Sequence, residues 1–549
     1  MKIRSFLFAL LAISLFSVFS ARAQNRTDVY AITNARIVTV SGAAIEKGTV
    51  VVRDGLIESV GADARVPADA RVLDGTGLTV YPGFFDALTS LGLSAPQPQT
   101  QQRGQGGGQS PQPQSNSNYP GGLQPEVSTF DALKAGDAVF ETNRNAGFTT
   151  ALTIPRDGIF NGQSAVINLA GETVSEIVIK SPFAEHFSFR TTQNGAYPAS
   201  LLGTFSAFRQ MLLDAQRLQE LQKMYAANPK GMKRPEADKS LEALFPVVNG
   251  TMPIVFNANI EREIVRALDL AKEFKLNAII AGGQEAWKVA TRLKEQNVPV
   301  LLSLNFPKRT TSASPEADSE DMETLRFRAE TPKCAARLAQ AGVRFAFESG
   351  GMTNLNDFFA NAAKATENGL AGDAAIRAMT LSSAQILGVD NRLGSIETGK
   401  IANLTVVRGD ILAKDKTITH VFVDGRLFEQ KEKPKTPPTT ANGTTTTAIA
   451  NVGGNYTITI EIPGQTTPGT LNLTQQGANL TGTFQTDATG ISPIKDGKVT
   501  ADGFSFTTSV TLNGTTFDIT VSGKVAGTSI SGTIDSPQGA IPFTGAKNP

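Results

Sequence analysis

Short apolar runs alternate with helical patterns through the middle of the chain. The clearest helical pattern covers residues 260–274, where apolar positions recur every three or four residues. Apolar runs of strand length occupy residues 80–86, 149–154, 165–169, 176–179, 253–257, 277–281, 299–304 and 344–348. Strands that are apolar on both faces and alternate with helices are typical of a parallel sheet covered by helices. The pattern therefore predicts an α/β fold, a (β/α)8 barrel over residues 78–388, with a doubly wound sheet as the alternative.

Two β-rich segments bracket the barrel region. Residues 24–77 contain apolar runs joined by Asp54 and Gly55, a pair that favours a tight hairpin turn. Residues 389–430 return to the same pattern of strands and turns. A further region, residues 453–549, alternates apolar with polar or small residues and has Gly and Asn at its turns. It predicts a separate all-β domain with antiparallel strands, either a small barrel or a sandwich.

Three segments outside these domains differ in composition. Residues 95–122 are mostly Gln, Gly, Pro and Ser, so they have little to bury and are expected to be disordered. Residues 431–452 form a linker rich in Pro and Thr. Residues 1–23 combine Lys2 and Arg4 with an apolar stretch and end in Ala-Arg-Ala. This pattern predicts a cleaved signal peptide and a bacterial periplasmic or secreted protein without a later membrane span.

The overall composition excludes some classes of function. The chain has 549 residues, which predicts two or three domains, and a net charge of +1 from 51 basic and 50 acidic residues. A charge so evenly balanced gives no electrostatic basis for binding nucleic acid or an anionic membrane. The single cysteine, Cys334, excludes an internal disulfide and a cysteine-based zinc cluster, and we expect it to be buried.

Several stretches of the chain resemble the amidohydrolase superfamily, most closely its exported imidazolonepropionase-like branch. The resemblance extends over about residues 28–430 and is carried by residues 81–93, 158–167, 279–290, 375–388 and 394–407. It implies a TIM-like barrel flanked by a small composite β-sandwich unit, to which residues 24–77 and 389–430 both contribute. It also implies hydrolysis of non-peptide C–N bonds with the help of Zn²⁺ or another divalent metal.

The positions at which that family binds metal carry other side chains here. In the resemblance, the two histidines of the first strand correspond to Leu88 and Ser90. The histidines of strands 5 and 6 correspond to Asn257 and Gly282, and the aspartate of strand 8 corresponds to Gly350. The whole chain has only two histidines. We therefore expect no metal at these positions and no cofactor.

The remaining titratable candidates lie near the ends of the predicted strands. His186 follows the fourth predicted strand and is a candidate for reaching the barrel mouth, whereas His420 lies in the second β-rich flank and is expected to be structural. Asp86 and Glu348 lie near the ends of strands 1 and 8 and are the best candidates for a catalytic acid or base. Together with Glu285 they are also candidates for holding Mg²⁺ or Ca²⁺, or they bond only to backbone and Arg neighbours.

Substrate contacts are expected at the barrel mouth, from Ser90, Asn257, Gly282, Ser349 and Gly350. Three functions are compatible with these observations. The first is a degenerate amidohydrolase that binds a small amide or peptide-like ligand, or that pairs in a homo- or hetero-oligomer with a metal-bearing homologue. The second is an active hydrolase of cyclic amides or dipeptides that lacks the usual histidine metal site. The third is a surface or glycan-binding protein that works through residues 453–549.

Overall fold

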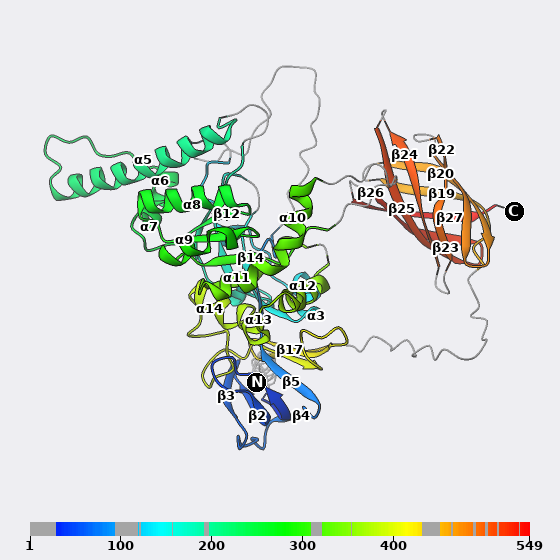
Figure 1. Cartoon of the computed structure of the whole chain (residues 1–549), viewed down its shortest axis with the longest axis horizontal. Helices are drawn as coiled ribbons and strands as arrows, with labels where there is room; N and C mark the ends of the chain where they lie inside the picture. Colours follow the sequence, from blue (N-terminus) through cyan, green and yellow to red (C-terminus); the bar gives the residue numbers. More distant parts are fainter. Residues whose placement is uncertain are drawn as a thin grey trace, which may run out of the picture. The chain divides into compact units, whose positions relative to one another are not determined.

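The computed structural model divides the chain into two compact units, residues 1–433 and 434–549 (Figure 1). It describes residues 29–93, 119, 122–155, 158–191, 197–308, 321–352, 354–430, 451–462, 465–486, 490–499, 503–512, 515–536 and 539–548. The predicted signal peptide, nearly all of the predicted insertion at 95–122 and nearly all of the predicted linker at 431–452 lie outside these residues. Within the described part, no helix is long and apolar enough to cross a membrane.

The first unit contains a barrel of mainly parallel strands, as the alternation of apolar runs and helices predicts. Neighbouring parallel strands pair in register from β11 to β15, and β6 pairs with β7 in the same way. The parallel strands are β6 (Phe84–Thr89), β7 (Phe148–Thr153), β11 (Glu185–Ser188), β12 (Ile254–Ala258), β13 (Ala278–Gly282), β14 (Val300–Ser303) and β15 (Phe345–Glu348). The fold is therefore of the TIM-barrel type.

Two successive strands of the barrel, β8 (Phe160–Gln163) and β9 (Ala165–Asn168), run antiparallel to their parallel neighbours. β9 pairs antiparallel with β7, and β8 pairs antiparallel with β11. β8 and β9 therefore connect the parallel strands β6–β7 with the parallel strands β11–β15. The amino end of β8 lies at the carboxyl ends of these parallel strands.

Helices cover the outside of the barrel and complete its core (Figure 1). An outer layer of buried aromatic side chains, including Phe187 and Phe256, faces them, and Phe208 of the long helix α5 packs against Phe187 at 4.5 Å between ring centroids. A separate inner cluster that includes Phe85 and Leu301 fills the barrel itself. The helices are α2 (Thr129–Ala132), α3 (Asp137–Asn145), α4 (Val174–Ile177), α5 (Leu201–Ala227), α6 (Lys239–Ala243), α7 (Phe245–Val248), α8 (Glu261–Phe274), η1 (Ala286–Val289), α9 (Ala290–Glu295), α10 (Met322–Glu330), η3 (Thr331–Lys333), α11 (Cys334–Gln340), α12 (Asn356–Glu367), α13 (Gly372–Ala378) and α14 (Leu381–Leu387).

The two β-rich flanks join in one sheet beside the barrel. Its order is β18-β17-β16-β5-β1-β2-β3, with β4 paired to β1, and the two flanks meet where β16 pairs antiparallel with β5. The strands are β1 (Tyr30–Ile37), β2 (Ile45–Arg53), β3 (Leu56–Gly61), β4 (Arg71–Asp74), β5 (Leu78–Pro82), β16 (Leu404–Arg408), β17 (Thr417–Val423) and β18 (Arg426–Glu429). Asp54 and Gly55 form the turn between β2 and β3, as predicted. The composite origin of this unit is confirmed, whereas its description as a sandwich stays a prediction.

Two strand predictions need correction. The run at 176–179 is the end of α4 followed by β10 (Val178–Lys180), which pairs with β9 only. The barrel strand between β8 and β12 is instead β11. The apolar pattern did not predict β11, because three of its four residues, Glu185, His186 and Ser188, are polar and yet buried. The run at 80–86 is two strands, since Gly83 separates β5 of the composite sheet from β6 of the barrel.

The second unit is a closed barrel of antiparallel strands, which confirms one of the two predicted forms. Its strand order is β20-β19-β27-β26-β25-β24-β23-β21-β22, and pairing of β20 with β21 closes it around a buried apolar cluster. Corresponding strands recur fifty residues apart, so that β19, β20 and β21 match β24, β25 and β26 in length. The strands are β19 (Gly454–Ile462), β20 (Gln465–Gln476), β21 (Asn479–Thr486), β22 (Gly490–Pro493), β23 (Lys495–Val499), β24 (Phe504–Leu512), β25 (Thr515–Ala526), β26 (Ser529–Ser536) and β27 (Gly539–Lys547).

Candidate functional site

Three neutral side chains meet at one end of the barrel. Ser188 and Asn257 are neighbours in the parallel register of β11 and β12, close to the carboxyl ends of both strands. Asn161 lies near the amino end of β8, which reaches the same end of the barrel because β8 runs antiparallel to β11. The Ser188 hydroxyl donates to Asn161 Oδ1 at 2.8 Å, and Asn257 Nδ2 donates to Ser188 Oγ at 2.9 Å. We call Asn161, Ser188 and Asn257 the amide triad.

The amide triad is mostly buried but reaches the surface through one member. Asn161 and Ser188 are 3% and 4% exposed, and Asn257 is half-buried. Asn257 Nδ2 also lies 3.3 Å from Asn161 Oδ1, so both of the triad's short contacts to Asn257 use its amide nitrogen. Its amide oxygen accepts no hydrogen bond from the described residues. The triad therefore presents an acceptor that remains available to a ligand.

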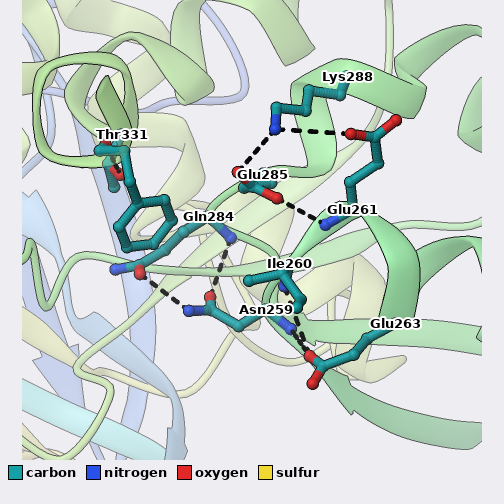
Figure 2. A network of polar contacts seen from close by, with 9 residues as sticks. Asn259, Ile260, Glu261, Glu263, Gln284, Glu285, Lys288 and Thr331 are labelled. Atoms are coloured by element: carbon teal, nitrogen blue, oxygen red, sulfur yellow. Dashed lines mark hydrogen bonds and ion pairs between the residues drawn. The ribbon is translucent and has the colours of Figure 1, made fainter. Parts of the chain in front are cut away.

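Further amides tie together the loops that follow β12, β13 and β14 (Figure 2). Asn259 and Gln284 are doubly bonded: Gln284 N donates to Asn259 Oδ1 at 3.1 Å, and Asn259 Nδ2 donates to Gln284 Oε1 at 3.0 Å. Gln284 Nε2 then donates to the Asn305 carbonyl at 2.8 Å, and Asn305 Nδ2 donates to the Gly350 carbonyl at 3.3 Å. Neutral side chains thus hold the ends of four neighbouring strands in place.

Glu285 lies in the same network but does not serve the barrel mouth. Its carboxylate accepts a hydrogen bond from Glu261 N at 2.8 Å and forms an ion pair with Lys288 at 2.7 Å (Figure 2). Glu261 is the first residue of α8, so a carboxylate at this point satisfies a free backbone N–H and complements the helix dipole. The geometry gives Glu285 a helix-capping role.

The two predicted acid or base residues are bonded to backbone N–H groups. Asp86 is 1% exposed, and its Oδ1 accepts from Ser349 N at 3.0 Å and from Leu88 N at 3.4 Å. Glu348 is 2% exposed and accepts from Gly350 N. The structure thus brings Asp86, Ser349 and Glu348 together, and both carboxylates bond to backbone, while their predicted roles as acid, base or cation ligand stay predictions. Asp86 holds the turn after β15 against β6, and Glu348 bonds within that turn.

The two glycines among the predicted mouth residues adopt conformations that disfavour other side chains. Gly282 has φ +90°, and Gly350 has φ +61°, both in the left-handed region. A Cβ atom at Gly350 would lie 2.3 Å from Ser303 Oγ, and one at Gly282 would lie 3.3 Å from Asn259 Oδ1. A histidine at the first position or an aspartate at the second would therefore be strained. Of the remaining predicted residues, Ser90 is exposed and Leu88 packs against the inner cluster.

His186 lies inside the barrel wall and not at its mouth. It is fully buried on β11, and its Nε2 lies 2.9 Å from Ser164 Oγ. The Ser164 hydroxyl also lies 3.2 Å from the Ala184 carbonyl, to which it donates, so Nε2 is the donor to Ser164. Nδ1 then has no partner among the described residues. Burial lowers the pKa of His186 to about 3, so the ring is neutral at physiological pH.

The other two residues singled out from the sequence are structural. His420 lies on β17 of the composite sheet, and its Nδ1 is 3.0 Å from Thr419 Oγ1. Cys334 is fully buried at the start of α11, and burial raises the pKa of its thiol to about 12, so it is not a reactive thiolate.

The sequence interpretation missed most of the polar residues that meet at the mouth. Asn161, Ser188, Asn259, Gln284 and Asn305 were not among the predicted site residues. Two of them lay inside stretches that carry the family resemblance: Asn161 within 158–167 and Gln284 within 279–290. The signal that would have found them is a neutral amide at the end of a strand. Apolar periodicity gives such residues no weight.

The side chains at the mouth do not fit an imidazole-bound metal. The positions that the resemblance assigns to the family's metal ligands hold Leu88, Ser90, Asn257, Gly282 and Gly350. Among the described residues, no three His, Cys, Asp or Glu side chains come together in a way that could hold a metal ion. A catalytic zinc site needs three such ligands and an open position for water. We therefore derive no chemical step through a metal.

Part of this barrel is similar to proteins of a known family. Residues 263–428 match the amidohydrolase family. An amidohydrolase from Thermotoga maritima has a similar structure, with 25% identity and a TM-score of 0.61; the similarity covers 73% of this chain and 100% of that one. A Xaa-Pro dipeptidase with bound methionine shares 15% identity with a TM-score of 0.44, over 73% and 100% of the two chains. The sequence has no significant match among curated proteins.

These comparisons correct the expectation that no cofactor is used. Members of the matched family use a divalent metal. Histidine content was therefore an unsound basis for expecting no cofactor. The imidazolonepropionase-like branch and the substitution of the metal ligands remain predictions.

Proposed function

We propose that the barrel unit of this chain, which matches the amidohydrolase family over residues 263–428, binds a small, neutral amide or peptide-like ligand at the amide triad. The observation that carries the proposal is the meeting of Asn161, Ser188 and Asn257 at the carboxyl ends of the barrel strands. In TIM barrels, ligands bind at that end of the strands. Asn257 also stands where the resemblance puts a metal-binding histidine.

The chemistry of the triad favours a neutral amide over a charged ligand. Asn257 Nδ2 is engaged within the triad, and its Oδ1 is free to accept an N–H from a ligand. A carboxamide offers one donor and one acceptor and carries no net charge, so it makes such a bond without introducing an unpaired charge beside two buried residues. A ligand whose only polar group is a carboxylate would place its acceptor oxygens against Asn257 Oδ1, which is also an acceptor, so no hydrogen bond would form.

Hydrolysis is not part of the proposal. Asp86 and Glu348 both accept hydrogen bonds from backbone N–H groups, which favours a positioning role for these carboxylates over proton transfer. Burial keeps His186 neutral and away from the mouth. An active hydrolase of cyclic amides or dipeptides is therefore the competing outcome that an experiment has to separate.

Trp287 provides a probe for the experiment. It is the only tryptophan of the chain, it lies in η1 shortly after β13, and the Arg337 guanidinium stacks over its ring at 3.9 Å. Its fluorescence can be followed while hydantoin, N-acetyl-L-prolinamide or the dipeptide Ala-Pro is added. We expect saturable binding of at least one neutral amide. Asn257→Ala should weaken that binding about tenfold, the loss of roughly one hydrogen bond.

The control variant is Asn277→Ala. Asn277 is exposed and lies just before β13, at the opposite end of that strand from the triad, so its replacement should leave ligand affinity unchanged. Failure of all three probes to bind would overturn the proposal. Product release from hydantoin or Ala-Pro would overturn it as well, in favour of a hydrolase.

Other aspects of the function stay predictions. Export to the periplasm or medium and pairing with a metal-bearing homologue are both expected from the sequence. Co-purification from the native host tests the second of these, and recovery of a lone homodimer would contradict it. A glycan-binding role for the second unit is tested by binding assays on the full chain with and without residues 453–549.

A further inference from the structure

A fully buried acidic side chain lies on the outer face of the barrel, away from the amide triad. Glu185 is the first residue of β11 and is 0% exposed. Both of its carboxylate oxygens are buried and have no hydrogen-bond partner among the described residues. A buried carboxylate without a partner is strongly disfavoured, so its negative charge requires a compensating cation or hydrogen-bond donor.

Two more unsatisfied oxygens come from the chain segment that crosses the edge of β8. Glu126 Oε2 and Thr129 Oγ1 are also buried without a partner in the described part of the chain. The strand register brings this segment close to Glu185: Glu185 is opposite Gln163 of β8, and Gln163 forms a bridge with Ser128 on its other side. Glu126 and Thr129 flank that bridge on either side.

Close packing fixes the crossing segment against β8. Gln163 N donates to the Val127 carbonyl at 2.8 Å. Gly162 has φ +92°, and a Cβ atom there would lie 2.2 Å from the same carbonyl oxygen, so only glycine permits the approach. The four oxygens therefore belong to a built part of the fold.

Among the described residues, no cationic side chain acts on Glu185. Burial raises the pKa of Glu185 well above its usual range, and the negative charge of Glu126 raises it further. The nearby N–H groups of Gly162 and His186 oppose that rise only in part. His186 itself is neutral, since its pKa is about 3. The partly exposed Glu126 thus acts electrostatically on the buried Glu185, on which no described Lys or Arg acts.

We propose that Glu126, Glu185 and Thr129 form a binding site for a hard divalent cation, with Ca²⁺ as the ion it fits best. All the available groups are oxygens, and Ca²⁺ takes carboxylates, hydroxyls and waters in flexible geometry. Its charge compensates both carboxylates at once. Glu126 is partly exposed, so it connects the buried Glu185 with solvent and supplies a path of entry. The site is distinct from the barrel mouth and independent of the ligand proposed there.

The cation would hold the crossing segment along β8. Gly122 O already accepts from the N–H groups of Ile159 and Phe160, both at 2.9 Å, so the segment and the start of β8 move together. Asn161 of the amide triad is the next residue of that strand. Cation binding at Glu126 and Glu185 therefore stabilises the backbone that positions one member of the triad.

Thermal unfolding of the full chain tests this proposal, with CaCl₂ alone as the probe and Trp287 fluorescence as the signal. Trp287 reports on the barrel unit only, because the second unit has no tryptophan. In chelator-treated protein at pH 8, 1 mM CaCl₂ should raise the unfolding midpoint by about 3 °C or more, as expected for a ligand present far above its Kd. Glu185→Gln and Glu126→Gln should each abolish the rise.

The matched control is Glu220→Gln, an exposed glutamate of α5 that should keep the full calcium response. NaCl at equal ionic strength should have no comparable effect, because the response depends on coordination and not on screening. The proposal is overturned if calcium leaves the midpoint unchanged. It is also overturned if the rise persists in both Glu126→Gln and Glu185→Gln, or if only lowering the pH stabilises the wild type, because a proton then takes the place of the cation. Should Glu185→Gln fail to fold, calcium titration calorimetry on Glu126→Gln decides the question.

Discussion

Two seams of the barrel bury acidic side chains in opposite ways. At the β6–β15 seam, Asp86 and Glu348 are almost fully buried, and both accept hydrogen bonds from backbone N–H groups. At the β8–β11 seam, Glu185 is equally buried, but its oxygens and the neighbouring His186 Nδ1 have no partner among the described residues. Burial by itself therefore does not identify a functional acid in this protein. The two seams differ in the hydrogen bonds that their carboxylates accept. A buried carboxylate that accepts hydrogen bonds stabilises the fold, whereas a buried carboxylate that accepts none requires a compensating group.

The largest effect expected from this contrast concerns His186. Its pKa is about 3 in the folded protein, against a usual value near 6.5, so the unfolded chain binds a proton that the folded chain does not. Its contribution to stability is fully present above pH 6.5 and is lost as the pH falls towards 3, by about 1.4 kcal/mol per pH unit. His186→Gln should remove that part of the acid dependence. Urea unfolding followed by Trp287 fluorescence between pH 4 and 7 measures it, and equal slopes for both proteins would contradict it.

A smaller loss is expected at the β6–β15 seam. Asp86→Ala leaves the buried N–H of Ser349 without its acceptor, which should lower the free energy of unfolding by about 3 kcal/mol. Asp86→Asn keeps an acceptor oxygen and should lose less than half as much. Urea unfolding at pH 7 separates the two variants. Calcium should stabilise the wild type and both variants alike, so that neither loss changes, and a calcium response that requires Asp86 would remove the distinction between the seams.

Glu185 should respond with the opposite sign. Its raised pKa means that the folded chain binds more protons than the unfolded chain above the usual glutamate range, so stability falls as the pH rises through that window. In calcium-free buffer at pH 8, Glu185→Gln should therefore be more stable than the wild type by about 1–2 kcal/mol. The same unfolding assay measures it. A destabilised Glu185→Gln under these conditions would show that the carboxylate already has a stabilising partner.

The smallest effect is expected at Ser90, which follows β6 and is exposed. Its side chain was a predicted substrate contact, but it lies outside the amide triad. Ser90→Ala should change the free energy of unfolding by less than about 0.5 kcal/mol and should leave amide binding unchanged. A tenfold loss of affinity in the fluorescence titration would extend the candidate site from the triad to the end of β6.

The sequence predicted the fold better than the site. Apolar periodicity located β7, β12, β13, β14 and β15 to within a residue or two, because these strands are apolar on both faces. It failed at β11, where three of the four residues are polar and yet buried. Among the site residues, Asn257 was identified through its place in the family resemblance. Its partners Asn161 and Ser188 come from strands 96 and 69 residues away, a distance that no local pattern can bridge.

The amino-acid sequence by itself predicted the antiparallel second unit from local periodicity and the shortage of imidazoles from composition. The barrel and the composite sheet followed from periodicity together with the family resemblance. Only the tertiary structure decided which polar groups are satisfied. Asp86 and Glu185 are both acidic residues on barrel strands, and their neighbours in the sequence do not distinguish them. The difference arises because a hydrogen bond needs a partner brought within about 3 Å, and those partners come from distant parts of the chain.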